Sequence, residues 1–186
     1  MVAVREELAP LAEGSGASLH ELRCEAFRET LRRYARPDDD FAEELAEVYY
    51  GFRHVSLPPY PAVVECLTAL TSSYALGVLS NGNTPPEQLG LGELFTHRVY
   101  AEQVGMGKPE RGIFEHAARV AGARPGGRLL VGDSPRTDIA GARAAGWRAV
   151  WFCPDGECWP LEDDPPPSFV DFGQLPDLLA QLDGGS

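Results

Sequence analysis

The chain has 186 residues, enough to bury one sizeable core, and its 44% hydrophobic and 24% charged residues are typical of a soluble globular protein. Its 16 basic and 28 acidic residues give a formal net charge of −12. That charge repels nucleic acid and anionic membranes, so we expect neither as a partner. No stretch approaches the roughly 20 apolar residues of a membrane span, and the first ten residues lack the apolar core of a signal peptide. We therefore expect a cytoplasmic protein.

The first third of the chain shows only helical periodicity. Ser18 and Glu21 have the spacing of a capping box, and apolar residues recur at helical intervals between Leu19 and Tyr34. The acidic cluster at residues 38–40 predicts the start of a second helix. We expect that helix to carry a single apolar stripe, formed by Phe41, Leu45, Val48, Tyr49 and Phe52.

A proline-rich segment at residues 57–61 predicts a boundary between a helical cap, residues 1–57, and a second domain, residues 58–186. In the second domain, strand and helix patterns alternate. This alternation predicts a Rossmann-like α/β sandwich of three layers, with a parallel sheet between helices. Strands are expected at residues 75–79, 98–100, 129–131, 149–152 and 168–170, and helices are expected from residues 61, 109, 138 and 175.

Two candidate phosphate-binding segments follow or lie between these strands. Ser80, Asn81 and Gly82 follow the first strand, where a hydroxyl and the N–H groups of a turn can bind phosphate oxygens. The same three residues also fit an ordinary turn. Lys108 precedes Pro109 at a helix start, where an ammonium can neutralise phosphate or hold a carboxylate. The alternative for Lys108 is a solvated surface lysine.

A pair of carboxylates predicts a cation site. Asp133 ends the strand at residues 129–131, and Asp138 follows five residues later, at the expected start of the next helix. Two carboxylates at one strand end suit Mg2+, which prefers oxygen ligands and keeps several waters. The alternative is that Asp133 caps the turn and Asp138 caps the helix.

The order of these segments resembles the haloacid dehalogenase-like (HAD) hydrolase superfamily, and the resemblance covers nearly the whole chain. It implies that Ser80 hydrogen-bonds the transferring phosphoryl group and that Asn81 and Gly82 lend backbone donors. It also implies that Lys108 stabilises the charge of that group and of the nucleophile. Ser80 and Lys108 are therefore the expected catalytic residues.

The same resemblance implies a role for each carboxylate: Asp133 would ligate Mg2+, and Asp138 would support the metal's surroundings. The helices before Pro58 look like the inserted cap that closes over a small phosphorylated substrate. Positioning and charge stabilisation are what phosphoryl transfer requires, so this set of residues is chemically consistent.

One motif of the superfamily is missing. Its first motif is an apolar strand that ends in Asp-x-Asp, where the first Asp attacks phosphorus and the second acts as acid and base. In this sequence, residues 38–40 and 162–164 follow no apolar strand, and residues 1–4 are followed by Arg5 rather than by an aspartate. In the superfamily the missing strand lies between those ending at Ser80 and Asp133. Its absence should leave two inner strands with unpaired backbone groups.

Three explanations are open. Translation begins upstream of Met1 or the chain is truncated; the chain is a non-catalytic relative that binds a phosphate ligand or a protein; or the sheet re-pairs through a partner chain. We adopt the first and predict a Mg2+-dependent phosphatase of a small phosphorylated metabolite that works through an aspartyl-phosphate. The chain as given should show almost no turnover, since losing a nucleophile can cost on the order of 10⁶-fold in rate.

A dehalogenase on the same scaffold is the other catalytic alternative, which the carboxylate pair disfavours because it indicates a metal. The sequence leaves the substrate and the oligomeric state open, and a homo-oligomer is among the assemblies it allows.

Overall fold

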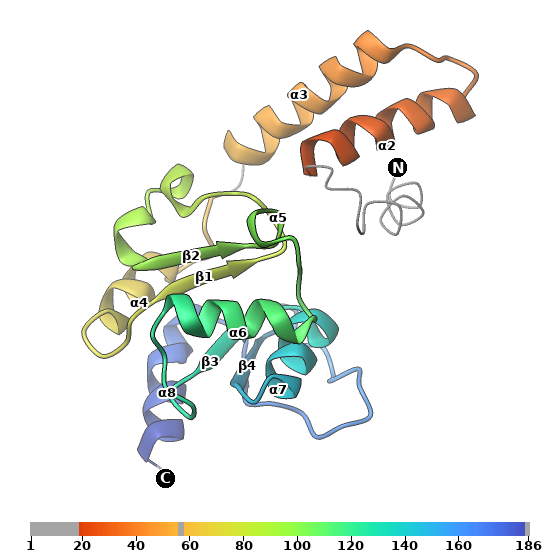
Figure 1. Ribbon diagram of the computed structural model, residues 1–186. Helices are drawn as coiled ribbons and strands as arrows, with labels where there is room; N and C mark the ends of the chain where they lie inside the picture. The colour runs from red at the N-terminus through yellow and green to blue at the C-terminus, as the bar shows by residue number, and fades with distance from the viewer. Residues whose placement is uncertain (1–18, 56–57, 185–186) are drawn as a thin grey trace. The chain divides into compact units, whose positions relative to one another are not determined.

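The computed structural model describes residues 19–55 and 58–184 (Figure 1). These residues form two compact units, one with helices α2 (Leu19–Arg33) and α3 (Asp39–Val55), and one with all the described strands. The amino-acid sequence predicted this order of elements, with helices first and an alternating α/β segment second. The predicted capping residue Ser18 lies outside the described residues. Among the described helices, none has both the length and the apolarity that crossing a bilayer requires.

Helices α2 and α3 pack through small side chains. Ala42 and Ala46 of α3 are fully buried, and they lie against the buried Cys24 and Phe27 of α2. Alanine at positions 42 and 46 lets the two helices approach closely because it places no bulk between them. The start of α3 is capped as predicted: the Asp38 carboxylate accepts a hydrogen bond of 2.9 Å from the Phe41 backbone N–H.

The predicted single stripe on α3 is wrong. Leu45 and Tyr49 pack against the buried alanines, whereas Phe41, Val48 and Phe52 are exposed. Positions 42, 45, 46 and 49 share one helix face at 3.6 residues per turn. The larger apolar residues at positions 41, 48 and 52 lie beside that face. The prediction chose them because they are more hydrophobic than alanine, but the buried face is the one that carries the alanines.

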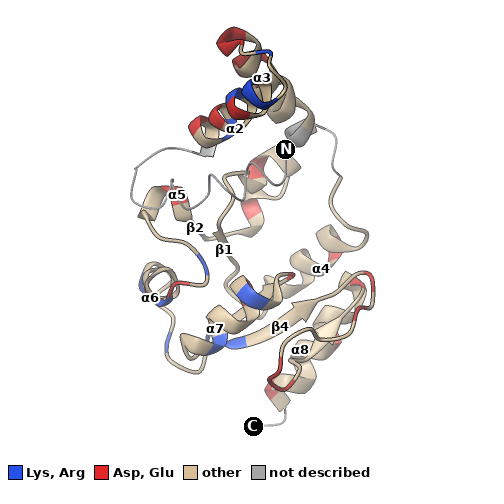
Figure 2. Cartoon of the chain, turned by 90° about the vertical axis from the view of Figure 1, so that its right-hand side faces the viewer, with Lys and Arg blue, Asp and Glu red and all other residues tan. Residues whose placement is uncertain are grey.

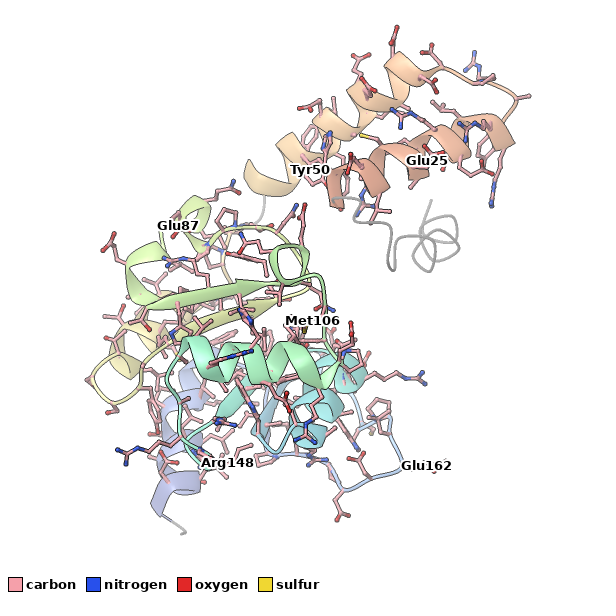
Figure 3. All side chains as sticks on the ribbon, viewed as in Figure 1. Glu25, Tyr50, Glu87, Met106, Arg148 and Glu162 are labelled. Carbon is pink, nitrogen blue, oxygen red and sulfur yellow. The ribbon has the colours of Figure 1, made fainter. Side chains whose placement is uncertain are left out.

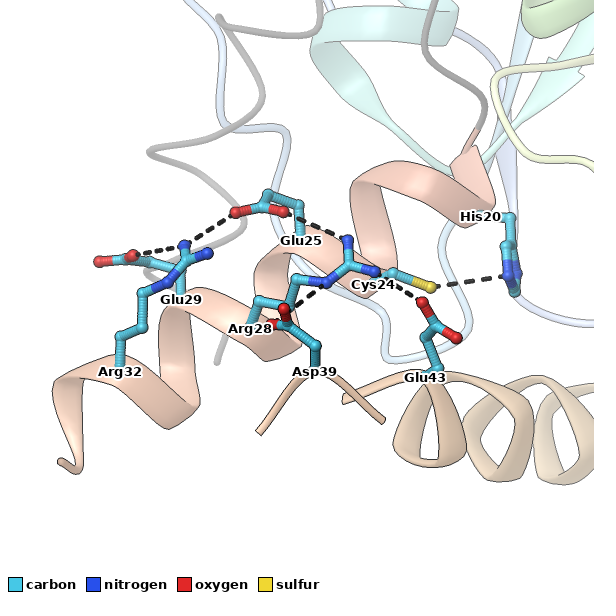
Figure 4. A network of polar contacts seen from close by, with 8 residues as sticks. All are labelled: His20, Cys24, Glu25, Arg28, Glu29, Arg32, Asp39 and Glu43. Carbon is cyan, nitrogen blue, oxygen red and sulfur yellow. Dashed lines mark hydrogen bonds and ion pairs between the residues drawn. The ribbon is translucent and has the colours of Figure 1, made fainter. Parts of the chain in front are cut away.

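Ion pairs join the polar sides of α2 and α3 (Figure 4). Arg28 of α2 pairs with Glu25 at 3.4 Å, and it reaches across to Asp39 at 3.7 Å and to Glu43 at 2.8 Å. Basic and acidic residues are interspersed on α2 (Figure 2). All four side chains of the Arg28 network are partly solvent-exposed, so each pair contributes about 0–1 kcal/mol.

The strands of the second unit form two parallel sheets. In the first sheet, β1 (Gly77–Ser80) pairs with β2 (His97–Tyr100). In the second, the order is β3 (Leu129–Gly132), β4 (Arg148–Phe152) and β5 (Ser168–Phe169). Within the described part of the chain, β1 and β3 each have a neighbouring strand on one side only.

Helices cover both faces of the strands. Helix α6 (Arg111–Val120) and the short α7 (Gly141–Ala144) pack into one apolar cluster. Helices α4 (Val63–Leu70) and α8 (Leu175–Gly184) pack into another. Met106, labelled in Figure 3, packs against the α6 cluster. The arrangement is the three-layer α/β fold that the sequence predicts.

Strand β4 separates the two clusters. Its residues Ala149 and Trp151 belong to the α6 cluster, while Val150 and Phe152 belong to the cluster of α4 and α8. Successive side chains of a strand point to opposite faces, so a strand buried on both sides is apolar throughout. This explains the unbroken apolar run that predicted β4.

Several boundaries differ from those predicted. The helix expected from Pro61 begins at Val63, after Ala62 in a left-handed conformation, and the strand expected at 75–79 is β1 at residues 77–80. The helix expected from Asp138 is also different. The chain forms a π-helical segment, η3 (Pro135–Ala140), which contains Asp138 and leads into α7.

Candidate functional site

Lys108 is held at the ends of two strands. Its ammonium donates a hydrogen bond of 2.9 Å to the backbone oxygen of Leu79 in β1, and it lies 2.8 Å from Asp138 Oδ1 in η3, the segment after β3. The Lys108 and Asp138 side chains are only 11% and 6% exposed. Lys108 is therefore a largely buried, ion-paired residue, and the solvated-lysine alternative is wrong.

Asn81 fixes the loop that carries Lys108. The Asn81 amide group donates to the Lys108 backbone oxygen at 2.8 Å and accepts from the Lys108 backbone N–H at 2.7 Å. A Cβ on Gly107 would lie 3.2 Å from Asn81 Oδ1, so glycine there lets the two loops meet. Sequence reasoning assigned Asn81 only a backbone role and missed this side-chain contact, because no local signal links residues 27 positions apart.

Asp138 is enclosed by its own loop as well as by Lys108. Asp138 Oδ2 accepts a hydrogen bond of 3.2 Å from the Ser134 backbone N–H, and the Thr137 hydroxyl lies 3.4 Å from Oδ1. The capping role expected as an alternative for Asp138 belongs instead to Ser134, whose hydroxyl accepts from the Thr137 N–H at 3.3 Å. Both oxygens of Asp138 are therefore engaged by the protein.

Asp133 has a different environment from Asp138. It follows the last residue of β3 and is exposed, and its side chain has no hydrogen bond or ion pair to residues 19–55 or 58–184. Its backbone oxygen accepts a 3.0 Å hydrogen bond from the indole N–H of Trp151, which fixes the position of the main chain. No local sequence signal indicates this Trp151 contact, because the two residues are 18 positions apart. Asp133 thus presents an open carboxylate on an anchored turn.

The remaining predicted residues lie near the end of β1. Ser80 is the half-buried last residue of β1, in register with Tyr100 of β2. Burial raises the pKa of the Tyr100 phenol, and its hydroxyl has no hydrogen-bond partner among the described residues. Gly82 follows Asn81 but groups with the helical unit, so we do not include it in the cluster of Ser80, Asn81 and Lys108.

The donor set bears on the expected Mg2+. Among the described residues, no group of three or more His, Cys, Asp or Glu side chains converges as a metal site. Mg2+ does not require one, because it commonly binds one or two carboxylates together with waters and substrate phosphate. The open carboxylate of Asp133 suits direct binding to such an ion. Asp138, which is paired with Lys108, is suited to an indirect role in which it orients Lys108 rather than binding the ion.

Gly132 gives a test of how tightly this site is built. A Cβ at Gly132 would lie 2.7 Å from Asp138 Cγ, so a side chain there must displace the Asp138 carboxylate. We expect Gly132→Ala to lower the free energy of unfolding by roughly 1–3 kcal/mol, as overpacking does. Gly127→Ala is the control, since its Cβ would meet only a backbone oxygen at 3.6 Å. Urea unfolding of both variants measures the difference, and equal stabilities would contradict the packing described.

A lysine–aspartate pair lies at the carboxyl ends of two parallel strands, beside an open carboxylate, and this set of charges is chemically suited to an anion and a cation together. The haloacid dehalogenase-like hydrolase family matches residues 5–146 of the chain. The chain therefore belongs to that family, as the sequence motifs indicated.

Individual relatives agree with this assignment. A phosphoserine phosphatase of Thermus thermophilus is 36% identical over 148 residues, which are 76% of this chain and 59% of that protein. A pyrimidine 5'-nucleotidase of Escherichia coli is 34% identical over 137 residues, 70% of this chain and 57% of the relative. The chain thus spans little more than half the length of these two relatives.

A solved structure is also similar. The 2-haloacid dehalogenase of Pseudomonas syringae pv. tomato superimposes with a TM-score of 0.79 at 34% sequence identity. The match covers 97% of this chain and 80% of that one.

Proposed function

We propose that this protein is a Mg2+-dependent phosphatase of a small phosphorylated metabolite. The observation that carries the proposal is the position of Lys108, held between β1 and η3. A lysine ammonium has three N–H donors, and the described contacts of Lys108 use two of them, to Leu79 and Asp138. The third is available to a phosphoryl oxygen. The phosphatase and nucleotidase relatives support this choice of reaction.

The proposed roles follow from the geometry and the chemistry of each group. Ser80 and the Asn81 backbone N–H donate hydrogen bonds to the phosphoryl group, and Lys108 offsets its negative charge. Asp133 holds Mg2+, which would supply further charge neutralisation to the phosphoryl oxygens. Asp138 orients Lys108. In this proposal the helices before residue 58 form the cap that encloses the substrate.

The haloacid dehalogenase similarity favours a second candidate, dehalogenation of a small acid. The two candidates differ in the anion they bind and in their need for a metal. An exposed carboxylate such as Asp133, with no cationic partner among the described residues, would repel a carboxylate substrate unless a metal ion neutralised it. That feature supports the phosphatase over the dehalogenase.

Binding of orthovanadate, a phosphate analogue, tests the proposal. We expect calorimetry to show binding that tightens at least tenfold with Mg2+, because the cation and Lys108 share the anion's charge. Asp133→Asn should remove the Mg2+ effect without loss of stability, since the Asp133 side chain has no described partner. The exposed Asp177 of α8 gives the matched control, Asp177→Asn.

Product release separates the candidates. The purified chain is assayed for phosphate from p-nitrophenyl phosphate and for chloride from 2-chloropropionate. Orthovanadate binding with very slow phosphate release is the expected result, because none of the described strands ends in the nucleophile motif. Chloride release would favour the dehalogenase. Failure to bind orthovanadate in the presence of Mg2+ would contradict the proposed function.

A further inference from the structure

The peptide group that joins Asp133 to Ser134 is held at both of its polar atoms. Its carbonyl oxygen accepts a hydrogen bond of 3.0 Å from the indole N–H of Trp151, and its N–H donates one of 3.2 Å to Asp138 Oδ2. A peptide group is planar, so two hydrogen bonds at different atoms fix the orientation of the whole plane. They thereby fix the direction in which the chain leaves Asp133.

Trp151 also fixes the residue before Asp133. Gly132, the last residue of β3, is in register with Trp151 in the ladder between β3 and β4. Contacts of Trp151 therefore hold the chain on both sides of Asp133, through the ladder before it and through the indole after it. Because the backbone on either side of a Cα atom determines where its Cβ points, these contacts orient the open carboxylate of Asp133.

The Trp151 ring is held in turn by the segment between β4 and β5. Trp151 is 5% exposed, and its ring makes an edge contact with Trp159 at a centroid distance of 5.1 Å. The Trp159 indole N–H donates to the backbone oxygen of Asp163 at 3.0 Å and to its Oδ1 at 3.1 Å. Arg143 of α7 donates to Asp163 Oδ2 at 2.6 Å. A series of contacts thus runs from α7 through this segment to the turn at Asp133.

We propose that Trp151 is a positioning residue for the cation site, whose indole N–H holds the Asp133 carboxylate in the orientation that binds Mg2+. The inference rests on the proposed function, in which Asp133 holds that ion. A buried indole N–H usually takes a hydrogen-bond partner, but here the acceptor belongs to the residue that carries the open carboxylate. Trp151 does not touch the ion, and it acts through the backbone of Asp133. Replacing a group that orients a metal ligand typically weakens metal binding by about 10–100-fold.

Trp151→Phe tests the proposal, because it keeps an aromatic ring and removes the N–H. Trp147→Phe is the matched control: Trp147 packs against the same α6 cluster, where its ring makes an edge contact with Phe114. Titration calorimetry with MgCl2 measures the affinity of each variant, and circular dichroism checks that each is folded. We expect Trp151→Phe to weaken Mg2+ binding about tenfold, and Trp147→Phe to bind Mg2+ as the unchanged chain does.

Nuclear magnetic resonance of the unchanged chain gives a second readout, which packing alone would not move. The chain has three tryptophans, so three indole N–H signals are expected. Trp147→Phe and Trp159→Phe each remove one signal and so assign the third to Trp151. We expect the Trp151 signal to shift as MgCl2 is added, with the affinity that calorimetry gives, and the Trp147 signal to stay in place. Asp133→Asn should abolish the shift.

The results that would overturn the positioning role differ from those that would overturn the proposed function. Equal Mg2+ affinities of Trp151→Phe and Trp147→Phe, or a Trp151 indole signal that ignores Mg2+ while calorimetry shows binding, would reject the positioning role alone. Absence of Mg2+ binding to the unchanged chain would reject the cation site at Asp133, and with it both proposals.

Discussion

Replacing Lys108 with methionine is expected to lower the free energy of unfolding by about 3–5 kcal/mol, because it leaves a buried carboxylate without its counter-charge. Asp138 is 6% exposed at its side chain, and Lys108 Nζ lies 2.8 Å from it. The hydrogen bonds from Ser134 and Thr137 do not neutralise the charge that remains. Urea unfolding followed by circular dichroism measures the loss.

A double-mutant cycle separates the pair from ordinary packing losses. Lys108→Met combined with Asp138→Asn should cost less than the sum of the two single changes, because the double variant contains no unpaired charge. The exposed pair of Arg111 and Glu115, 2.7 Å apart, is the control. Its disruption should cost less than about 1 kcal/mol. Additive losses at Lys108 and Asp138 would show that the two residues do not act as a pair.

Truncating Phe114 to alanine is the second large effect that we expect. Phe114 lies on α6 and is fully buried, and its ring makes an edge contact with Trp147 at a centroid distance of 5.7 Å. The ring packs so close to Gly141 that a Cβ there would lie 3.0 Å from it. We expect Phe114→Ala to cost about 3–5 kcal/mol, the range for removing a large buried ring.

The control for this truncation is Val120→Ala on the same helix, because Val120 is exposed. Surface changes of this kind usually stay within about 0.5 kcal/mol. Thermal or urea unfolding of the two variants gives the comparison. A small loss at Phe114 would mean that the layer between α6 and the strands tolerates a cavity, contrary to its close packing.

The sequence predicted the elements of the α/β unit because their signals are local. The apolar run at residues 149–152 becomes β4, and the leucines of the last helix, Leu175 and Leu179, are buried in α8. The order of Ser80, Lys108 and Asp133 also placed the candidate site at the carboxyl ends of strands. These predictions rest on periodicity and on motif order, which a single sequence contains.

The contacts within the site were less predictable because they join distant residues. The pairing of Lys108 with Asp138 and the double hydrogen bond between Asn81 and Lys108 depend on how the loops meet. The π-helical turn at η3 also has no periodic signal, so the sequence suggested an ordinary helix start at Asp138. The role of each expected catalytic residue stays a prediction until binding is measured.

Strand β4 has a consequence for how the α/β unit comes apart. Consecutive side chains of β4 enter different layers, Trp151 on the side of α6 and Phe152 on the side of α8. Loss of this strand would expose both apolar clusters to water, so we expect the two clusters to unfold together. Helix α6, which serves one layer, can fray with a more limited penalty. We therefore expect β4 and the two apolar clusters to unfold cooperatively, whereas the ends of α6 can open locally.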